Sequence, residues 1–362
     1  MFKKIYKLGE LTMMKKAIEQ EYERHRLIDL FWECTLTCNA KCKHCGSSAE
    51  KKKYEGELTT EEIKNAFKQI ANDMEADKIL INVTGGEPLV RKDLCEVMEY
   101  ATNELGFHWG MTTNGILLND ENIEKLRKAK KETVSISIDG LEETHDEFRG
   151  VPGSYKTIIE NIKNLKAAGF VKHIQVTTVF HKKNISQLNE LYEIMLGLNL
   201  DSWRLASMDP IGRANENNEF LLDGKELKIL LDFIKSKKNN KKLELMYGCP
   251  SFLGLEYEKE VRKGYFYCRT GINIASILYN GDLFVCPNVQ RRKDLIQGNI
   301  KTDNFKDVWD NKYKQFRHKE RTKCGSCEKC EHWEYCLGGA FHTWNFEENV
   351  QNKCVYKMIN DK

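Results

Sequence analysis

The stretch Cys38-Asn-Ala-Lys-Cys42-Lys-His-Cys45 comes directly after LIDLFWE at residues 27–33, which has the character of a buried strand. Its three thiols lie within eight residues and can converge on one centre. A closed structural zinc site uses four protein ligands, and a 4Fe–4S cluster is usually held by four cysteines. Three thiolates would leave one iron of such a cluster free to bind another molecule. A zinc site completed by Cys34 or His44 is the alternative interpretation.

Beyond this stretch, short apolar strands alternate with helical patterns. The helix predicted at 59–75 opens with Thr59 and Glu62, an N-cap arrangement, and the helix at 154–168 stops at Gly169. The other predicted strands are 78–84, 107–113, 133–138, 173–180 and 202–208, and the other helices are 91–104, 120–129, 186–197 and 223–238. Six such units predict an α/β fold, a partial (β/α)6 barrel with its site at the carboxyl ends of the strands.

The length of 362 residues allows a second domain. The charged run KSKKNNKKLE at 235–244 has no apolar periodicity, so we place the boundary there, with a barrel at 27–245 and a cysteine-rich domain at 246–362. Residues 1–26 form an extension in which Leu11, Met14, Ile18 and Tyr22 share one helical face. A docked extension and a substrate-engaging segment are both compatible with that pattern.

Composition narrows the functional class. A net charge of +3 does not favour nucleic acid as a partner. No apolar run approaches the roughly 20 residues that a membrane-spanning helix needs. The 13 cysteines are odd in number and no export signal precedes them, so metal-binding or catalytic thiols in a reducing cytoplasm are favoured over a disulfide framework.

Polar residues follow the predicted strands. Gly85-Gly86-Glu87-Pro88 ends the second strand, where the glycines allow close backbone approach to a ligand and Glu87 offers a carboxylate. Thr113 and Asn114 end the third strand, and Ser135, Ser137 and Asp139 share one face of the fourth. These patterns indicate a polar lumen. An ordinary turn at 85–88 and a solvated edge face at 135–139 are the alternatives.

Together these motifs resemble the radical S-adenosylmethionine (radical SAM) family. The resemblance implies that Cys38, Cys42 and Cys45 hold a 4Fe–4S cluster whose open iron binds SAM. It also implies reductive cleavage of SAM to a 5′-deoxyadenosyl radical that abstracts hydrogen from a substrate. The residues that it assigns to SAM are His44, Gly85, Gly86, Glu87, Pro88, Thr113, Asn114, Ser137, Asp139 and Arg149. His44 would lie near the adenine and Arg149 would pair with the carboxylate of SAM. The alternatives are a solvated loop histidine and a surface salt bridge.

The cysteine-rich end resembles the SPASM extension of the same family. Cys268 is followed after 12 residues by Gly281 and then by Cys286. The resemblance implies two auxiliary iron–sulfur clusters, the second held by Cys327, Cys330, Cys336 and Cys354. The family's final cysteine is replaced by Ala340, and an early ligand of the first cluster is missing. Either Cys249 and Cys324 take the place of these two ligands, or the first cluster has an open iron or contains only two irons. A zinc ribbon is the alternative.

The resemblance predicts an enzyme that modifies a peptide or protein side chain by oxidation, cross-linking or epimerisation. A small molecule or cofactor precursor is the alternative substrate, and a zinc scaffold or an electron-transfer protein is the non-enzymatic alternative. Sulfatase-maturing relatives carry an aspartate base after the cysteine equivalent to Cys286, where this chain has Pro287. Formylglycine formation is therefore disfavoured, and no catalytic base can be named. An external electron donor of the flavodoxin or ferredoxin type is implied.

Overall fold

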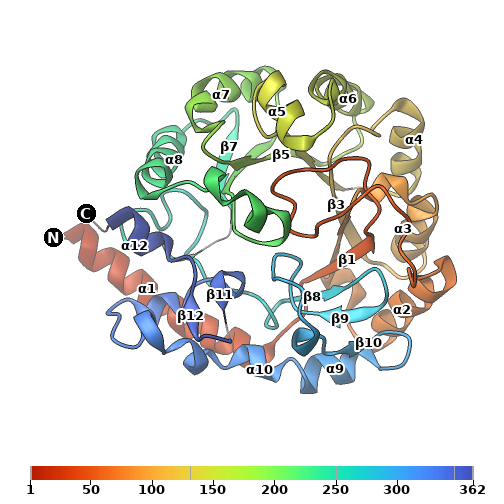
Figure 1. The fold of residues 1–362 in the computed structure, drawn as a ribbon. Helices are drawn as coiled ribbons and strands as arrows, with labels where there is room; N and C mark the ends of the chain where they lie inside the picture. The colour runs from red at the N-terminus through yellow and green to blue at the C-terminus, as the bar shows by residue number, and fades with distance from the viewer. Residues whose placement is uncertain (1, 131, 249–250, 346, 361–362) are drawn as a thin grey trace.

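A curved parallel sheet carries the fold (Figure 1). The computed structural model describes residues 2–130, 132–248, 251–345 and 347–360. Neighbouring strands β1 to β7 all pair in parallel, in chain order. These strands are β1 Asp29–Thr35, β2 Leu80–Gly85, β3 His108–Thr113, β4 Thr133–Ser137, β5 His173–Phe180, β6 Ser202–Ser207 and β7 Glu244–Tyr247. The predicted α/β class and the six predicted strands are confirmed, and β7 is an addition.

Helices cover the outer face of this sheet (Figure 1). They are α2 Thr60–Asp73, α3 Leu94–Asn103, α4 Asp120–Lys128, α5 Glu142–Arg149, α6 Ser154–Ala168, α7 Leu188–Gly197 and α8 Gly224–Lys237. The Thr59 side chain accepts from the backbone N–H of Glu62, and the Glu62 side chain accepts from that of Thr59. Such a cap contributes about 1 kcal/mol. The predicted C-cap is also confirmed, since Gly169 adopts the left-handed conformation at the end of α6.

The cysteine-rich region extends the same sheet. Strand β8, Ile274–Ile277, pairs in parallel with β1, and β9, Asp282–Phe284, and β10, Gly298–Asn299, follow it in antiparallel pairs. The remaining elements are β11 Trp344–Asn345, β12 Val350–Gln351, α9 Phe305–Asn311, α10 Lys314–Arg317, α11 Trp333–Cys336 and α12 Val355–Asn360. The cysteine-rich region therefore joins the barrel strands along β1, the strand that precedes the first cysteine motif.

The N-terminal extension is the helix α1, Phe2–Arg24. Leu11 and Ile18 are buried, as the helical pattern predicts. The Lys7 ammonium donates to the carbonyl of Leu255 at 2.7 Å, and Lys259 pairs with Glu10 at 2.5 Å. The helix is therefore docked on the cysteine-rich region. None of the helices in the described part of the chain has the length and apolar character of a membrane span.

Candidate functional site

A cavity of about 630 Å³ lies along the inner face of the sheet and reaches the carboxyl ends of the strands. Cys38, Cys42 and Cys45 all line it, so the structure brings the three thiols of the first motif together. Most of the residues expected to contact SAM line the same cavity: His44, Gly85, Gly86, Thr113, Asn114, Ser137 and Arg149. Ser135 also faces it, which confirms the polar lumen. Glu87, Pro88 and Asp139 are buried behind the wall.

The loop that carries the three thiols is braced by the segment after β6. The Arg213 guanidinium donates to the carbonyls of Cys42 at 2.9 Å and Ala49 at 2.8 Å. The backbone N–H of Arg213 donates to the carbonyl of Cys45 at 3.1 Å. Arg213 therefore supports the loop that carries the three thiols.

Gly212 permits this close approach, and its replacement by alanine is expected to displace the loop. Its φ is +60°, and a Cβ would lie 2.5 Å from the carbonyl oxygen of Cys45 and closer still to that of Gly46. We expect Gly212→Ala to lower the free energy of unfolding by about 2 kcal/mol, because strained backbone and overpacking each cost 1–3 kcal/mol. Iron bound per chain should fall as well, measured by colorimetric assay after anaerobic purification.

Gly46→Ala is the matched control for that variant. It lies in the same loop, yet a Cβ there meets only the Cγ2 of Ile211, at an ordinary 3.8 Å. Its stability and iron content should stay close to those of the wild type. Equal losses in both variants would show that the loop tolerates no added methyl group, and would contradict the specific role of Gly212.

The three thiols fit a metal cluster in their chemistry. Burial raises the pKa of Cys38 to about 11 and also raises that of Cys42. Ionised thiolates at these positions therefore require a compensating cation or metal. Among the described residues, no three His, Cys, Asp or Glu side chains converge on a single metal ion. The ligands of an iron–sulfur cluster can lie farther apart than those of a single metal ion, because each thiolate binds a different iron.

Neither proposed fourth zinc ligand joins the three thiols. Cys34 is fully buried within the main hydrophobic core and does not line the cavity. The His44 Nε2 atom lies 3.5 Å from the Asp139 carboxylate. The zinc site completed by Cys34 or His44 therefore finds no support in the geometry.

The turn after β2 is built around Glu87. Its carboxylate accepts from the Thr113 hydroxyl at 2.7 Å, the Asn114 backbone N–H at 2.8 Å and the Leu89 backbone N–H at 3.1 Å. The Asn114 amide in turn donates to the Asn39 side chain at 2.6 Å, next to the first cysteine. Glu87 thus fixes the neighbouring strand ends, while Gly85 and Gly86 form the wall itself. The ordinary-turn interpretation of 85–88 does not account for this network.

Arg149 forms a buried ion pair with Asp139. Its Nε lies 2.7 Å and its Nη2 2.6 Å from the same carboxylate oxygen, and its Nη1 lies 3.6 Å from the Cys42 sulfur. Burial alone would raise the pKa of Asp139, but the charge of Arg149 lowers it to about 2. The surface salt bridge considered for Arg149 is wrong, since both partners are buried. A role toward SAM stays a prediction for both residues.

His44 stacks in an aromatic column beside the cavity. Its ring is parallel to Phe148 at a centroid distance of 5.1 Å, and Phe148 stacks on His181 at 3.7 Å. Burial lowers the pKa of His44 to about 4, so the ring is neutral near pH 7. The solvated-loop interpretation of His44 is therefore wrong, and its proximity to adenine stays a prediction.

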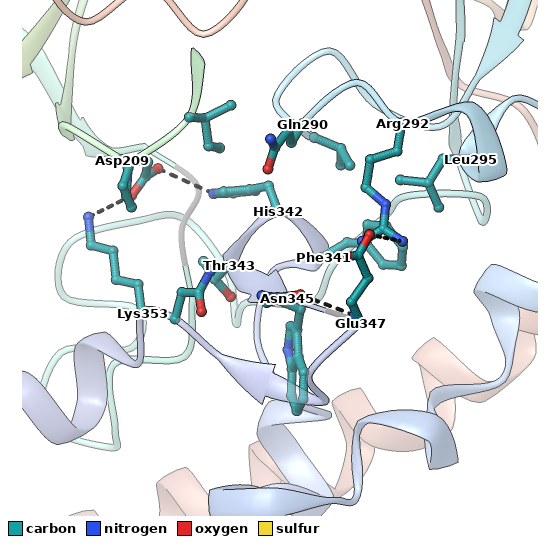
Figure 2. A pocket seen from close by; sticks show the side chains of 15 residues that line it. Asp209, Gln290, Arg292, Leu295, Phe341, His342, Thr343, Asn345, Glu347 and Lys353 are labelled. Carbon is teal, nitrogen blue, oxygen red and sulfur yellow. Dashed lines mark hydrogen bonds and ion pairs between the residues drawn. The ribbon is translucent and has the colours of Figure 1, made fainter. Parts of the chain in front are cut away.

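Figure 2 shows a side cavity of about 310 Å³. It shares Asp209 and Ile211 with the central cavity. Lys353, from the cysteine-rich region, lies 2.5 Å from the Asp209 carboxylate, and His342 lies 3.3 Å from its other oxygen. Sequence reasoning missed this group, because 144 residues separate Lys353 from Asp209. It ties the cysteine-rich region to the end of β6.

Four of the later cysteines also come together. Cys327, Cys330, Cys336 and Cys354 line one small pocket. Burial and the neighbouring thiols raise the pKa of Cys336 to about 12, so these thiols, too, need a metal to stay ionised. This set fits the predicted second auxiliary cluster.

The first auxiliary set is described only in part. Cys268 is buried, and its sulfur accepts from the Phe341 backbone N–H at 3.4 Å. Cys286 follows β9, and Cys324 lies 3.8 Å from the carbonyl of Asn349. Cys249 lies outside the described residues. The ligands of the first cluster therefore stay a prediction.

Comparison with known proteins agrees with this geometry. Residues 32–195 match the model of the radical SAM superfamily, and residues 268–331 match SPASM, an iron–sulfur cluster-binding domain. An AdoMet-dependent heme synthase of Methanosarcina barkeri is 29% identical, over 85% of this chain and 89% of that protein. The mycofactocin maturase MftC of Mycobacterium tuberculosis is 31% identical, over 86% of this chain and 78% of that protein.

A solved structure, Streptococcus suis SuiB bound to S-adenosylmethionine, shares the fold. Its TM-score is 0.69 at 22% identity, over 87% of this chain and 73% of that one.

Proposed function

This chain belongs to the radical SAM superfamily and carries a SPASM domain, and from that premise we propose that it modifies a peptide or protein side chain by hydrogen abstraction. Its cofactors are SAM, the 4Fe–4S cluster that binds it, and auxiliary iron–sulfur clusters. One observation carries the hydrogen-abstraction part of the proposal: the three thiols and the glycine turn after β2 line a single cavity. An external donor of the flavodoxin or ferredoxin type would supply electrons.

When bound, the cluster and SAM supply one-electron chemistry that generates a 5′-deoxyadenosyl radical. Cys38, Cys42 and Cys45 would hold the cluster. Arg213 and Gly212 keep their loop against the end of β6. Gly85 and Gly86 let the turn after β2 pack against the segment after β1, because a Cβ at either position would collide with the carbonyl oxygen of Thr35 or Thr37. Glu87 holds that turn in place through three hydrogen bonds, and the turn would bind the amino group of SAM.

The peptide assignment is supported by the relation to MftC, which is named as a maturase and matches most of this chain. The side cavity adds to this support. It lies between the barrel and the cysteine-rich region, and it meets the central cavity at Asp209 and Ile211. A chain seated there would have a side chain within reach of the lumen.

A small-molecule substrate is the second candidate. It is favoured by the heme synthase of Methanosarcina barkeri, whose similarity extends over 89% of that protein. The cavity and the cofactors would then be the same, and only the class of molecule that donates the hydrogen atom would differ.

Anaerobic reconstitution followed by dithionite and SAM tests the activity. We expect wild-type protein to form 5′-deoxyadenosine, detected by mass spectrometry. An extract of the producing cells, grown in deuterated medium, is then separated into a peptide- and protein-sized fraction and a small-molecule fraction. Deuterium should be transferred to 5′-deoxyadenosine only from the peptide- and protein-sized fraction. Transfer of deuterium from the small-molecule fraction would establish the small-molecule alternative. If no 5′-deoxyadenosine forms at all, both candidate functions are refuted.

A further inference from the structure

One charged side chain in the central cavity has no partner among the residues that the structure describes. Arg204 of β6 lines that cavity and is half-buried. Within the part of the chain that the structure describes, its guanidinium makes no hydrogen bond or ion pair. An incompletely solvated charge without a partner costs free energy, so a ligand that neutralises it would bind favourably.

The other charged groups on the cavity wall are already compensated. Arg149 is paired with Asp139, and Arg213 donates to backbone carbonyls. The Asp209 carboxylate is paired with Lys353. The charge of Arg204 is therefore the one that is left unmatched among these groups.

Strand alternation fixes the direction of Arg204. Trp203 and Leu205 are fully buried in the core, so Arg204 and Ala206 face the lumen. The strand register places Arg204 opposite Thr177 of β5.

The neutral groups around Arg204 are occupied with one another. The Thr177 hydroxyl lies 2.8 Å from that of Ser135, and the Gln175 amide donates to Ser135 at 3.0 Å. This wall supplies hydrogen-bonding groups and no negative charge to the guanidinium.

Building on the proposed function, we infer that Arg204 binds a carboxylate in the barrel lumen. A guanidinium recognises a carboxylate through two parallel N–H···O bonds. SAM, which the family places in this cavity, carries a carboxylate and no phosphate. The residue expected for that carboxylate, Arg149, already directs two of its nitrogens at Asp139. The carboxylate at Arg204 comes either from SAM or from the substrate.

Calorimetric titration of the anaerobic, reconstituted protein with malonate tests this inference without turnover. Malonate should bind the wild type, and Arg204→Gln should weaken that binding at least about tenfold, as loss of a charge-assisted pair predicts. Arg204→Lys keeps the charge and should lose less. Arg292→Gln is the matched control, because Arg292 lines only the side cavity and is paired with Asp294 at 2.9 Å.

Titrations with SAM separate the two sources. If SAM supplies the carboxylate, Arg204→Gln weakens SAM binding and saturating SAM prevents malonate binding. If the substrate supplies it, malonate still binds beside SAM and SAM affinity is unchanged. Malonate and SAM affinities that are both independent of Arg204 would overturn the inference. Failure of the wild type to cleave SAM would refute the proposed function alone, since these binding results stand without it.

Discussion

Cys42→Ala is expected to abolish formation of 5′-deoxyadenosine, at least about 10³-fold below the wild type, which corresponds to about 4 kcal/mol in the barrier. Cys42 is buried on the cavity wall, and its sulfur contacts Arg149. Two thiolates and an alanine cannot retain the cluster, so about four irons per chain should be lost. The measurements are iron content and mass spectrometry of the anaerobic reaction with dithionite.

Cys34→Ala is the control for that variant. Its thiol is equally buried and lies only four positions before Cys38, but it packs in the main core and does not line the cavity. It should keep its iron and its activity, with only the modest loss of stability that follows removal of a buried sulfur. A Cys42→Ala protein that still forms 5′-deoxyadenosine would refute the assignment of the three thiols.

Local pattern was sufficient for most of the fold. The predicted helix at 59–75 begins within a residue of α2, because its cap and its apolar face both lie in the sequence. Elements set by distant contacts were missed. Helix α5 has eight residues, too few to show a clear hydrophobic periodicity. Strand β7 begins at Glu244, the last residue of the charged run, and adds to the sheet beside β6. The pairing of β8 with β1, which links the predicted cysteine-rich domain to the barrel sheet, had no signal in the sequence either.

The site residues fall into the same two groups, those marked by local sequence patterns and those set by distant contacts. Cysteine spacing and the glycine turn are local, so the sequence indicated which residues would line the cavity. Contacts between distant parts of the chain could not be predicted, because nothing in the sequence marked the contact of Arg213 with the cysteine loop or of Lys353 with Asp209. Arg204 is the instructive case. Strand alternation could have placed it in the lumen, but only its neighbours in the described part of the chain show that its charge is unmatched there.

Arg149→Met should lower the free energy of unfolding by about 3–5 kcal/mol, the usual result of leaving one member of a buried ion pair alone. Asp139 is completely buried and would keep its hydrogen bond from the Val179 backbone N–H, at 2.8 Å, and its contact with His44 Nε2, at 3.5 Å, whose ring is neutral near pH 7. Its charge would then be poorly compensated. Urea unfolding of the reconstituted protein, followed by tryptophan fluorescence, gives the free energy directly.

A double-mutant cycle isolates the cause of that loss. If the uncompensated carboxylate is responsible, Asp139→Asn in the Arg149→Met background should restore a large part of the stability, because the buried charge has been removed. Glu147→Gln provides the matched control on the same helix. Glu147 pairs with Lys43 and Lys183, but half of its side chain is exposed, so the effect should stay below about 1 kcal/mol. Strictly additive losses at 139 and 149 would mean that the two residues contribute through separate packing, and the ion pair would then not be what holds α5 against the end of β4.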